Sequence, residues 1–150
     1  MKIFRIEREK HLKDVLKGIG ASLSNENRWN SIGTNLVYTA ENRSLAILEI
    51  LVHLDLKNEL PNDRVLIEID IPIKSNILTF NPKEIDLKNK NITKRLGDNF
   101  IKENQFLLLK VPSIITPFEY NYLLNPYHQL AEKIKINKIT PLKIDERLVY

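Results

Sequence analysis

The sequence contains no cysteine, and it is also poor in glycine and in long apolar runs. The first absence excludes disulfide bonds, thiolate nucleophiles and metal sites with cysteine ligands. None of the four glycines falls in a glycine-rich phosphate loop, which argues against a Rossmann domain or a P-loop NTPase. The longest apolar run, residues 45–54, is interrupted by Glu49 and His53 and is about half the length of a membrane-spanning helix.

The rest of the composition is that of an ordinary folded domain. The 150 residues are 43% hydrophobic and 28% charged, which predicts one domain over residues 1–150 around a single core. Residues 1–10 interleave charged and apolar side chains and lack an export signal, so we expect a cytoplasmic protein. The net charge of +4 would suit an acidic partner, but the lysines are scattered and form no basic cluster.

Apolar spacing predicts an α+β fold, with a mixed sheet and a few helices. Alternating patterns indicate strands at residues 3–7, 36–40, 65–71 and 106–111, and two closing strands around residues 134–136 and 142–144. Helical patterns cover residues 12–16, which Gly18 closes, residues 45–54 with Ser44 as N-cap, and a short segment at 96–102. Residues 18–34 and 75–93 are predicted as loops. Because strands and helices do not alternate regularly, a doubly wound parallel sheet is not expected.

The helix predicted at residues 45–54 carries the most unusual side chain. It is apolar almost all round, so we expect it to be buried centrally, yet Glu49 and His53 lie on one of its faces. Burying a carboxylate costs free energy unless a partner or a function compensates it. Glu49 is therefore a candidate functional residue.

Four motifs carry further chemistry: RWN at 28–30 followed by Gly33, VYTA at 37–40, LAILE at 45–49, and a last motif that runs from PS at 112–113 through Asn121 and NP at 125–126 to His128. In these motifs the chain resembles the RES-domain toxin family. The arginine, glutamate and serine after which that family is named match Arg28, Glu49 and Ser113. The resemblance covers about residues 5–147. One departure is Glu26-Asn27, where the family usually has glycine before the arginine.

The resemblance implies an ADP-ribosyltransferase-like fold and an enzyme that cleaves the nicotinamide–ribose bond of NAD. Such an enzyme is an NAD phosphorylase when phosphate is the acceptor, giving ADP-ribose 1-phosphate, and an NAD glycohydrolase when water is. NAD would be a substrate and phosphate a co-substrate, with no metal and no permanently bound cofactor. The implied partner is an Xre-type antitoxin, in a complex that allows a toxin homodimer, with no direct contact to nucleic acid or membrane.

Roles for the matched residues follow from their chemistry. Glycosidic cleavage develops positive charge on the sugar, which the Glu49 carboxylate would stabilise. The planar guanidinium of Arg28 suits phosphate oxygens. The Tyr38 ring could face nicotinamide and its hydroxyl could bind ribose. Ser113 and Asn125 complete the expected NAD-binding set, although Asn125-Pro126 is equally a simple turn.

Two other functions remain open. A related fold could transfer ADP-ribose to a protein or RNA. Alternatively, a basic protein could bind or cleave RNA through Arg28, His53 or His128. Against the RNA function, aromatic residues amount to only 7%, and no known RNA-binding motif is present.

Overall fold

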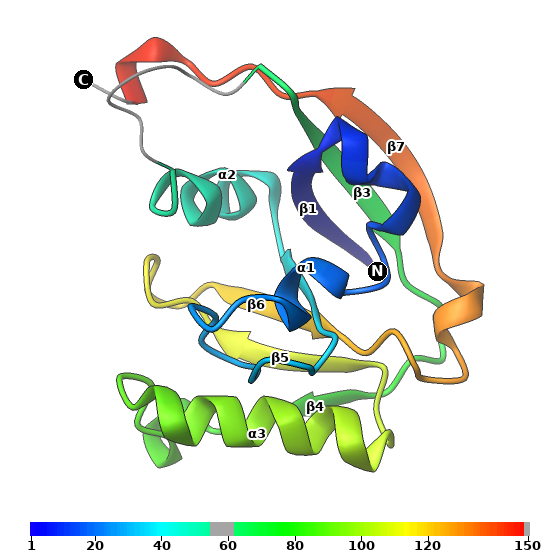
Figure 1. Ribbon diagram of the computed structural model, residues 1–150, viewed down its shortest axis with the longest axis vertical. Helices are drawn as coiled ribbons and strands as arrows, with labels where there is room; N and C mark the ends of the chain where they lie inside the picture. The colour runs from blue at the N-terminus through cyan, green and yellow to red at the C-terminus, as the bar shows by residue number, and fades with distance from the viewer. Residues whose placement is uncertain (55–61, 149–150) are drawn as a thin grey trace.

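Seven strands form one sheet in the order β4-β5-β6-β2-β1-β3-β7 in the computed structural model, which describes residues 1–54 and 62–148 (Figure 1). Only β4 and β5 pair in parallel, and all other neighbours are antiparallel. The predicted α+β class is confirmed. The strands are β1 (Lys2–Arg8), β2 (Val37–Ala40), β3 (Arg64–Asp70), β4 (Ile77–Thr79), β5 (Leu108–Pro112), β6 (Tyr120–Leu124) and β7 (Lys135–Pro141).

Within residues 1–54 and 62–148, three α-helices and four short 3-10 helices accompany the sheet. The α-helices are α1 (Ile19–Ser22), α2 (Arg43–Leu51) and α3 (Lys90–Glu103), and the 3-10 helices are η1 (Glu9–Asp14), η2 (Pro82–Glu84), η3 (Ala131–Lys133) and η4 (Glu146–Leu148). In the described part of the chain, no helix has the length and apolar character needed to cross a bilayer.

The sheet narrows between β1 and β2. These two strands meet at the single pair Phe4 and Ala40, whereas β1 pairs with β3 along its whole length. The guanidinium of Arg5 donates from Nη1 to the Tyr38 carbonyl at 2.8 Å, and its Nη2 contacts Glu7 at 2.6 Å. A side chain thus provides a hydrogen bond across the junction where the backbone ladder is short.

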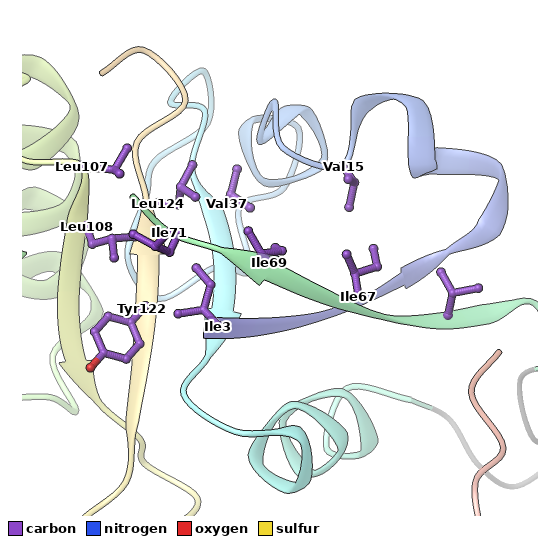
Figure 2. Close-up of a cluster of buried hydrophobic side chains, with 11 residues drawn as sticks. Ile3, Val15, Val37, Ile67, Ile69, Ile71, Leu107, Leu108, Tyr122 and Leu124 are labelled. Carbon is purple, nitrogen blue, oxygen red and sulfur yellow. The ribbon is translucent and has the colours of Figure 1, made fainter. Parts of the chain in front are cut away.

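Each face of the sheet has its own apolar cluster, because side chains alternate along the strands. One face carries buried residues such as Ile3, Val37 and Ile67, with Val15 packed over them (Figure 2). On the other face, α3 packs through Phe100 against the β5–β6 half, and α2 packs against β1 through Leu45. Each fully buried aliphatic side chain contributes about 1.5–3 kcal/mol to folding.

Helix α2 differs from its prediction at both ends. It begins at Arg43 with Asn42 as N-cap, whose side chain accepts from the Leu45 amide at 2.8 Å, so the N-cap expected at Ser44 is wrong. It ends at Leu51, and His53 lies beyond it. The helix is also not buried all round, since within the described residues only Leu45 and Ala46 of α2 are fully buried. Helix α2 packs beside the short β1–β2 junction, so its other apolar side chains remain partly exposed to solvent.

Other boundaries also needed correction. The segment predicted as loop at 75–93 contains β4, η2 and the start of α3, which is longer than the short helix expected at 96–102. The sequence pattern does not predict β6. Of the two expected closing strands, the one around residues 134–136 overlaps the longer strand β7, whereas residues 142–144 follow β7 and form no strand. The helical stripe at 12–16 is largely the 3-10 helix η1.

The loop that carries Arg28 lies directly on α3. Gly97 allows this contact, because a Cβ at that position would lie 1.7 Å from the Trp29 carbonyl oxygen. The Thr93 hydroxyl donates to the Arg28 carbonyl at 2.7 Å, and both Ser31 N and Ser31 Oγ donate to Asp98. Helix α3 therefore fixes the backbone of residues 28–31.

Replacing Gly97 with alanine tests this close approach. Alanine in a helix normally stabilises relative to glycine by about 1 kcal/mol, but here the added methyl must displace Trp29, so Gly97→Ala should destabilise by about 1–3 kcal/mol. Gly20→Ala is the matched control, because a Cβ there meets no atom within 4 Å. Equal denaturant midpoints for the two variants would contradict the proposed packing.

Candidate functional site

The corner between β2 and α2 is tied to the start of β6. The Glu41 amide donates to the Tyr120 carbonyl at 3.1 Å, and Glu41 Oε1 accepts from the Tyr120 amide at 2.8 Å. The N-cap residue Asn42 also donates to Glu119 at 3.2 Å. Glu49 follows Asn42 by seven residues, about two helical turns, so it lies on the same side of α2 as this anchored corner.

Glu49 is held there by two neutral donors. Its Oε1 accepts from Asn121 Nδ2 at 2.6 Å and from Ser113 Oγ at 3.1 Å. Ser113 follows β5 and Asn121 lies on β6, so side chains separated by more than 60 residues in sequence meet at this point. These bonds supply the compensation that a carboxylate in an apolar helix requires.

The Ser113 hydroxyl uses its whole hydrogen-bonding capacity inside the protein. Its oxygen accepts from the amides of Ile115 and Thr116, both at 3.1 Å, and its proton is donated to Glu49. A serine hydroxyl has one proton and two lone pairs. Ser113 therefore orients Glu49 and has no further proton to offer phosphate or ribose in this arrangement.

Tyr38 projects from the same face of the sheet as Asn121. Tyr38 pairs with Leu123 and Ala40 pairs with Asn121, so Tyr38 and Asn121 are diagonal neighbours on adjacent strands, about 7–8 Å apart. The Tyr38 hydroxyl donates to Asn30 Oδ1 at 2.8 Å and accepts from the Trp29 amide at 3.1 Å. The register of β2 against β6 therefore places this ring close to Asn121 and the Glu49 carboxylate that it holds, which we call the carboxylate corner.

Arg28 directly precedes Trp29, whose amide donates to the Tyr38 hydroxyl. Its Nη1 donates to the Leu87 carbonyl at 2.6 Å, and no carboxylate of residues 1–54 and 62–148 lies within ion-pair distance of its guanidinium. Burial is the main influence on the pKa of Tyr38 and raises it, while the nearby charge on Arg28 acts in the opposite direction. A half-buried guanidinium without an acidic partner is suited to binding an anionic ligand.

Asn27, which stands where the RES family usually has glycine, also contributes hydrogen bonds to the loop. Asn27 donates from Nδ2 to the carbonyl of Ala21 at 2.8 Å and to that of Ser24 at 3.4 Å. These bonds hold the loop to α1 just before the arginine. A residue other than glycine therefore contributes to the shape of the loop here.

The remaining candidates lie elsewhere. Asn125 follows the opposite end of β6 from Asn121 and is fully buried, and its side chain bonds to Asn104 and to the Tyr127 amide. His128 is buried next to it and accepts from the Leu130 amide, whereas His53 is exposed beyond α2. Asn125 and His128 therefore lie away from Glu49, and His53 makes no hydrogen bond or ion pair with Glu49 among the described residues. The NAD-binding role predicted for Asn125 receives no support from this geometry.

Asn121 and Asn30 are site residues whose contacts were not predicted. Asn121 belongs to the last sequence motif, but only the pairing of β6 with β2 and β5 reveals that it faces Glu49. Asn30 is fully buried and orients the Tyr38 hydroxyl. Its place in the RWN motif at 28–30 is the sequence signal that was available for Asn30.

A separate cavity of about 460 Å³ lies on the other side of β1. Its lining includes Arg5, Glu7 and Arg64. Arg5 and Glu7 alternate along β1 with Phe4 and Ile6, which pack with α2. This cavity therefore faces away from α2 and Glu49, and it is not part of the carboxylate corner.

Comparison with known proteins gives concordant results. The family model described as RES domain matches residues 2–145. The chain is 36% identical to Toxin Res of Photorhabdus laumondii over 99% of this chain and 97% of that protein, and 34% identical to the Prs ADP-ribosylating toxin of Sphingobium sp. over 91% and 88%. A chain of the Mycobacterium tuberculosis MbcT–MbcA toxin–antitoxin complex matches with a TM-score of 0.72 and 13% identity, covering 95% of this chain and 84% of that chain. This match supports the expected ADP-ribosyltransferase-like fold.

The buried Tyr38 hydroxyl leads to a prediction about alkaline stability. Burial raises the pKa of Tyr38 above its ordinary value of 10, so the folded state disfavours the phenolate and stability is lost as the pH rises above about 10. Tyr38→Phe has no phenol at this position, so the part of the alkaline destabilisation that Tyr38 causes should be absent in the variant. Below about pH 9 the variant should be less stable by about 1–3 kcal/mol, because the Trp29 amide and Asn30 lose a partner.

Melting temperatures from about pH 8 to about pH 11 measure both effects. The difference between Tyr38→Phe and the wild type should narrow at the alkaline end. Tyr127→Phe serves as the control, because Tyr127 is 58% exposed. A constant difference across the range would show that the Tyr38 phenol titrates normally.

Proposed function

Because the chain belongs to the RES-domain toxin family, we propose that it is a toxin that cleaves NAD at the nicotinamide–ribose bond. The observation that carries this proposal is the Glu49 carboxylate, which two neutral donors hold beside Tyr38. A carboxylate held without a cationic partner keeps its full charge for a positively charged sugar.

In the proposed reaction the C–N bond breaks and nicotinamide leaves with the electron pair. The ribose carbon becomes oxocarbenium-like, and Glu49 stabilises its positive charge through space. An acceptor oxygen then forms the new bond. Phosphate gives ADP-ribose 1-phosphate, whereas water gives ADP-ribose and releases a proton.

Arg28 and Tyr38 would bind and orient NAD in this scheme. The Arg28 guanidinium has no carboxylate partner among the described residues and can form two parallel hydrogen bonds to the pyrophosphate or to incoming phosphate. The hydroxyl of Tyr38 is engaged by Trp29 and Asn30, so its aromatic ring is the part suited to contact nicotinamide.

ADP-ribosyl transfer to a macromolecule is the second candidate, since one relative is named as a Prs ADP-ribosylating toxin. The same bond is broken in both reactions and only the acceptor differs. The RNA-cleaving alternative has less support, because His128 is buried and bonded to the Leu130 amide. An antitoxin partner accords with the toxin–antitoxin complex among the similar structures. We propose that this partner is of the Xre type and that the pair acts in the cytoplasm.

Incubating the antitoxin-free protein with NAD distinguishes these reactions. Nicotinamide release should occur, with ADP-ribose 1-phosphate formed when phosphate is present and ADP-ribose when it is absent. Nicotinamide release only when a protein is added, with label transferred to that protein, would favour the transferase. Intact NAD with folded protein under every condition would exclude NAD cleavage.

Glu49→Gln tests the role of the carboxylate. Glutamine preserves shape and an Oε1 acceptor for Asn121 and Ser113, but it removes the charge. We expect kcat to fall by about 100-fold or more with little change in KM, and a melting temperature equal to or above that of the wild type. Glu103→Gln, on the exposed end of α3, is the matched control. Normal turnover in a Glu49→Gln protein that melts several degrees lower would make Glu49 a structural residue.

Arg28→Lys tests phosphate binding by the guanidinium. Lysine keeps the charge but loses the bidentate fork, so KM for NAD or for phosphate should rise about tenfold while the melting temperature changes little. Arg95→Lys, at an exposed position of α3, is the control for the chemical change alone. Unchanged steady-state constants in Arg28→Lys would remove Arg28 from the binding site.

A further inference from the structure

Asn121 holds the same carboxylate oxygen of Glu49 that Ser113 holds. Its Nδ2 lies 2.6 Å from Oε1, closer than the Ser113 hydroxyl at 3.1 Å. Within residues 1–54 and 62–148, no hydrogen bond or ion pair is made to Oε2. The carboxylate is therefore anchored through one oxygen, while the other is unengaged by the described residues.

The backbone fixes the direction of the Asn121 side chain. Asn121 lies on the inner strand β6 and pairs with Ala40 of β2 on one side and Val111 of β5 on the other. Pairing on both sides fixes the backbone and therefore the face of the sheet from which the Asn121 Cα–Cβ bond projects. Because an ionised carboxylate only accepts hydrogen bonds, the amide nitrogen must face Glu49.

No cation contacts this carboxylate among the described residues. The acids of the same corner have their own partners: Glu41 accepts from the Tyr120 amide, and Glu119 accepts from the Asn42 side chain. His53 is exposed past the end of α2. The Glu49 charge is thus oriented by neutral donors, whereas an ion pair would neutralise part of the field that acts on a cationic sugar.

We infer that Asn121 is a positioning residue, which fixes Oε1 of Glu49 through a neutral hydrogen bond and leaves Oε2 to face the reacting sugar. The catalytic part of this inference rests on the proposed NAD cleavage. The positioning itself concerns only the protein, so it can be measured without a substrate.

Asn121→Asp places a second carboxylate against Glu49 with little change in shape. Two carboxylates at this distance share one proton, so Glu49 should remain protonated to a higher pH than in the wild type. We expect kcat near pH 7 to fall by about 100-fold with little change in KM, and the acidic limb of the kcat profile to move to higher pH. Asn99→Asp adds the same charge on the exposed face of α3 and should leave the profile unchanged.

The Glu49 carboxyl resonance, assigned in ¹³C NMR spectra by its loss in Glu49→Gln, reports protonation without any turnover. Its titration should move to higher pH in Asn121→Asp. If it moves but the wild type does not cleave NAD, positioning stands and the proposed function fails. A wild-type titration and kcat in Asn121→Asp would overturn the inference.

Asn121→Ala provides the second variant if the aspartate prevents folding. Loss of the amide should lower kcat per folded molecule, with the pH profile unshifted because no charge is added. A lower melting temperature with wild-type kcat would show that Asn121 only supports the fold and would also overturn the inference.

Discussion

The narrow junction between β1 and β2 is the constraint on which the rest of the molecule depends. One backbone pair, Phe4 with Ala40, joins the strands, and the Arg5 side chain adds a hydrogen bond to Tyr38. Because the two strands separate on either side, helix α2 can pack beside them, where Arg43 pairs with the buried Glu68 and lies over the Phe4 ring.

This placement explains how an apolar helix carries an ionised side chain. The α2 residues that face the sheet junction are buried, but the helix is open to solvent along its outer side, including Leu48. Glu49 lies between these environments and obtains its hydrogen bonds from Ser113 and Asn121 rather than from bulk water alone. Half-burial lowers the desolvation cost, while the neutral donors keep the carboxylate oriented and its charge undiminished.

Sequence periodicity predicts the strands with clear alternation, such as β1 and β3, and the motifs indicate Arg28 and Glu49 as candidate site residues. Sequence patterns fail where the secondary structure that local residues favour differs from the one that tertiary contacts stabilise. Ser44 is a good N-cap by propensity, but Asn42 takes that role, and its side chain also donates to Glu119, the residue just before β6. Strand β6 is too short and too polar at its start to show a clear period, and its contacts with α2 depend on pairing that no local pattern encodes.

The β2–β6 register joins the two parts of the candidate site. Arg28 and Tyr38 are linked through the loop packed on Gly97, whereas Glu49 is held by Asn121, and these groups share no direct hydrogen bond among the described residues. Their relative position is therefore set by the backbone ladder. A slip of one residue would turn either Tyr38 or Asn121 to the opposite face of the sheet. The separation between the anion-binding arginine and the carboxylate is thus a property of strand pairing, which is why residues so far apart in sequence can form one site.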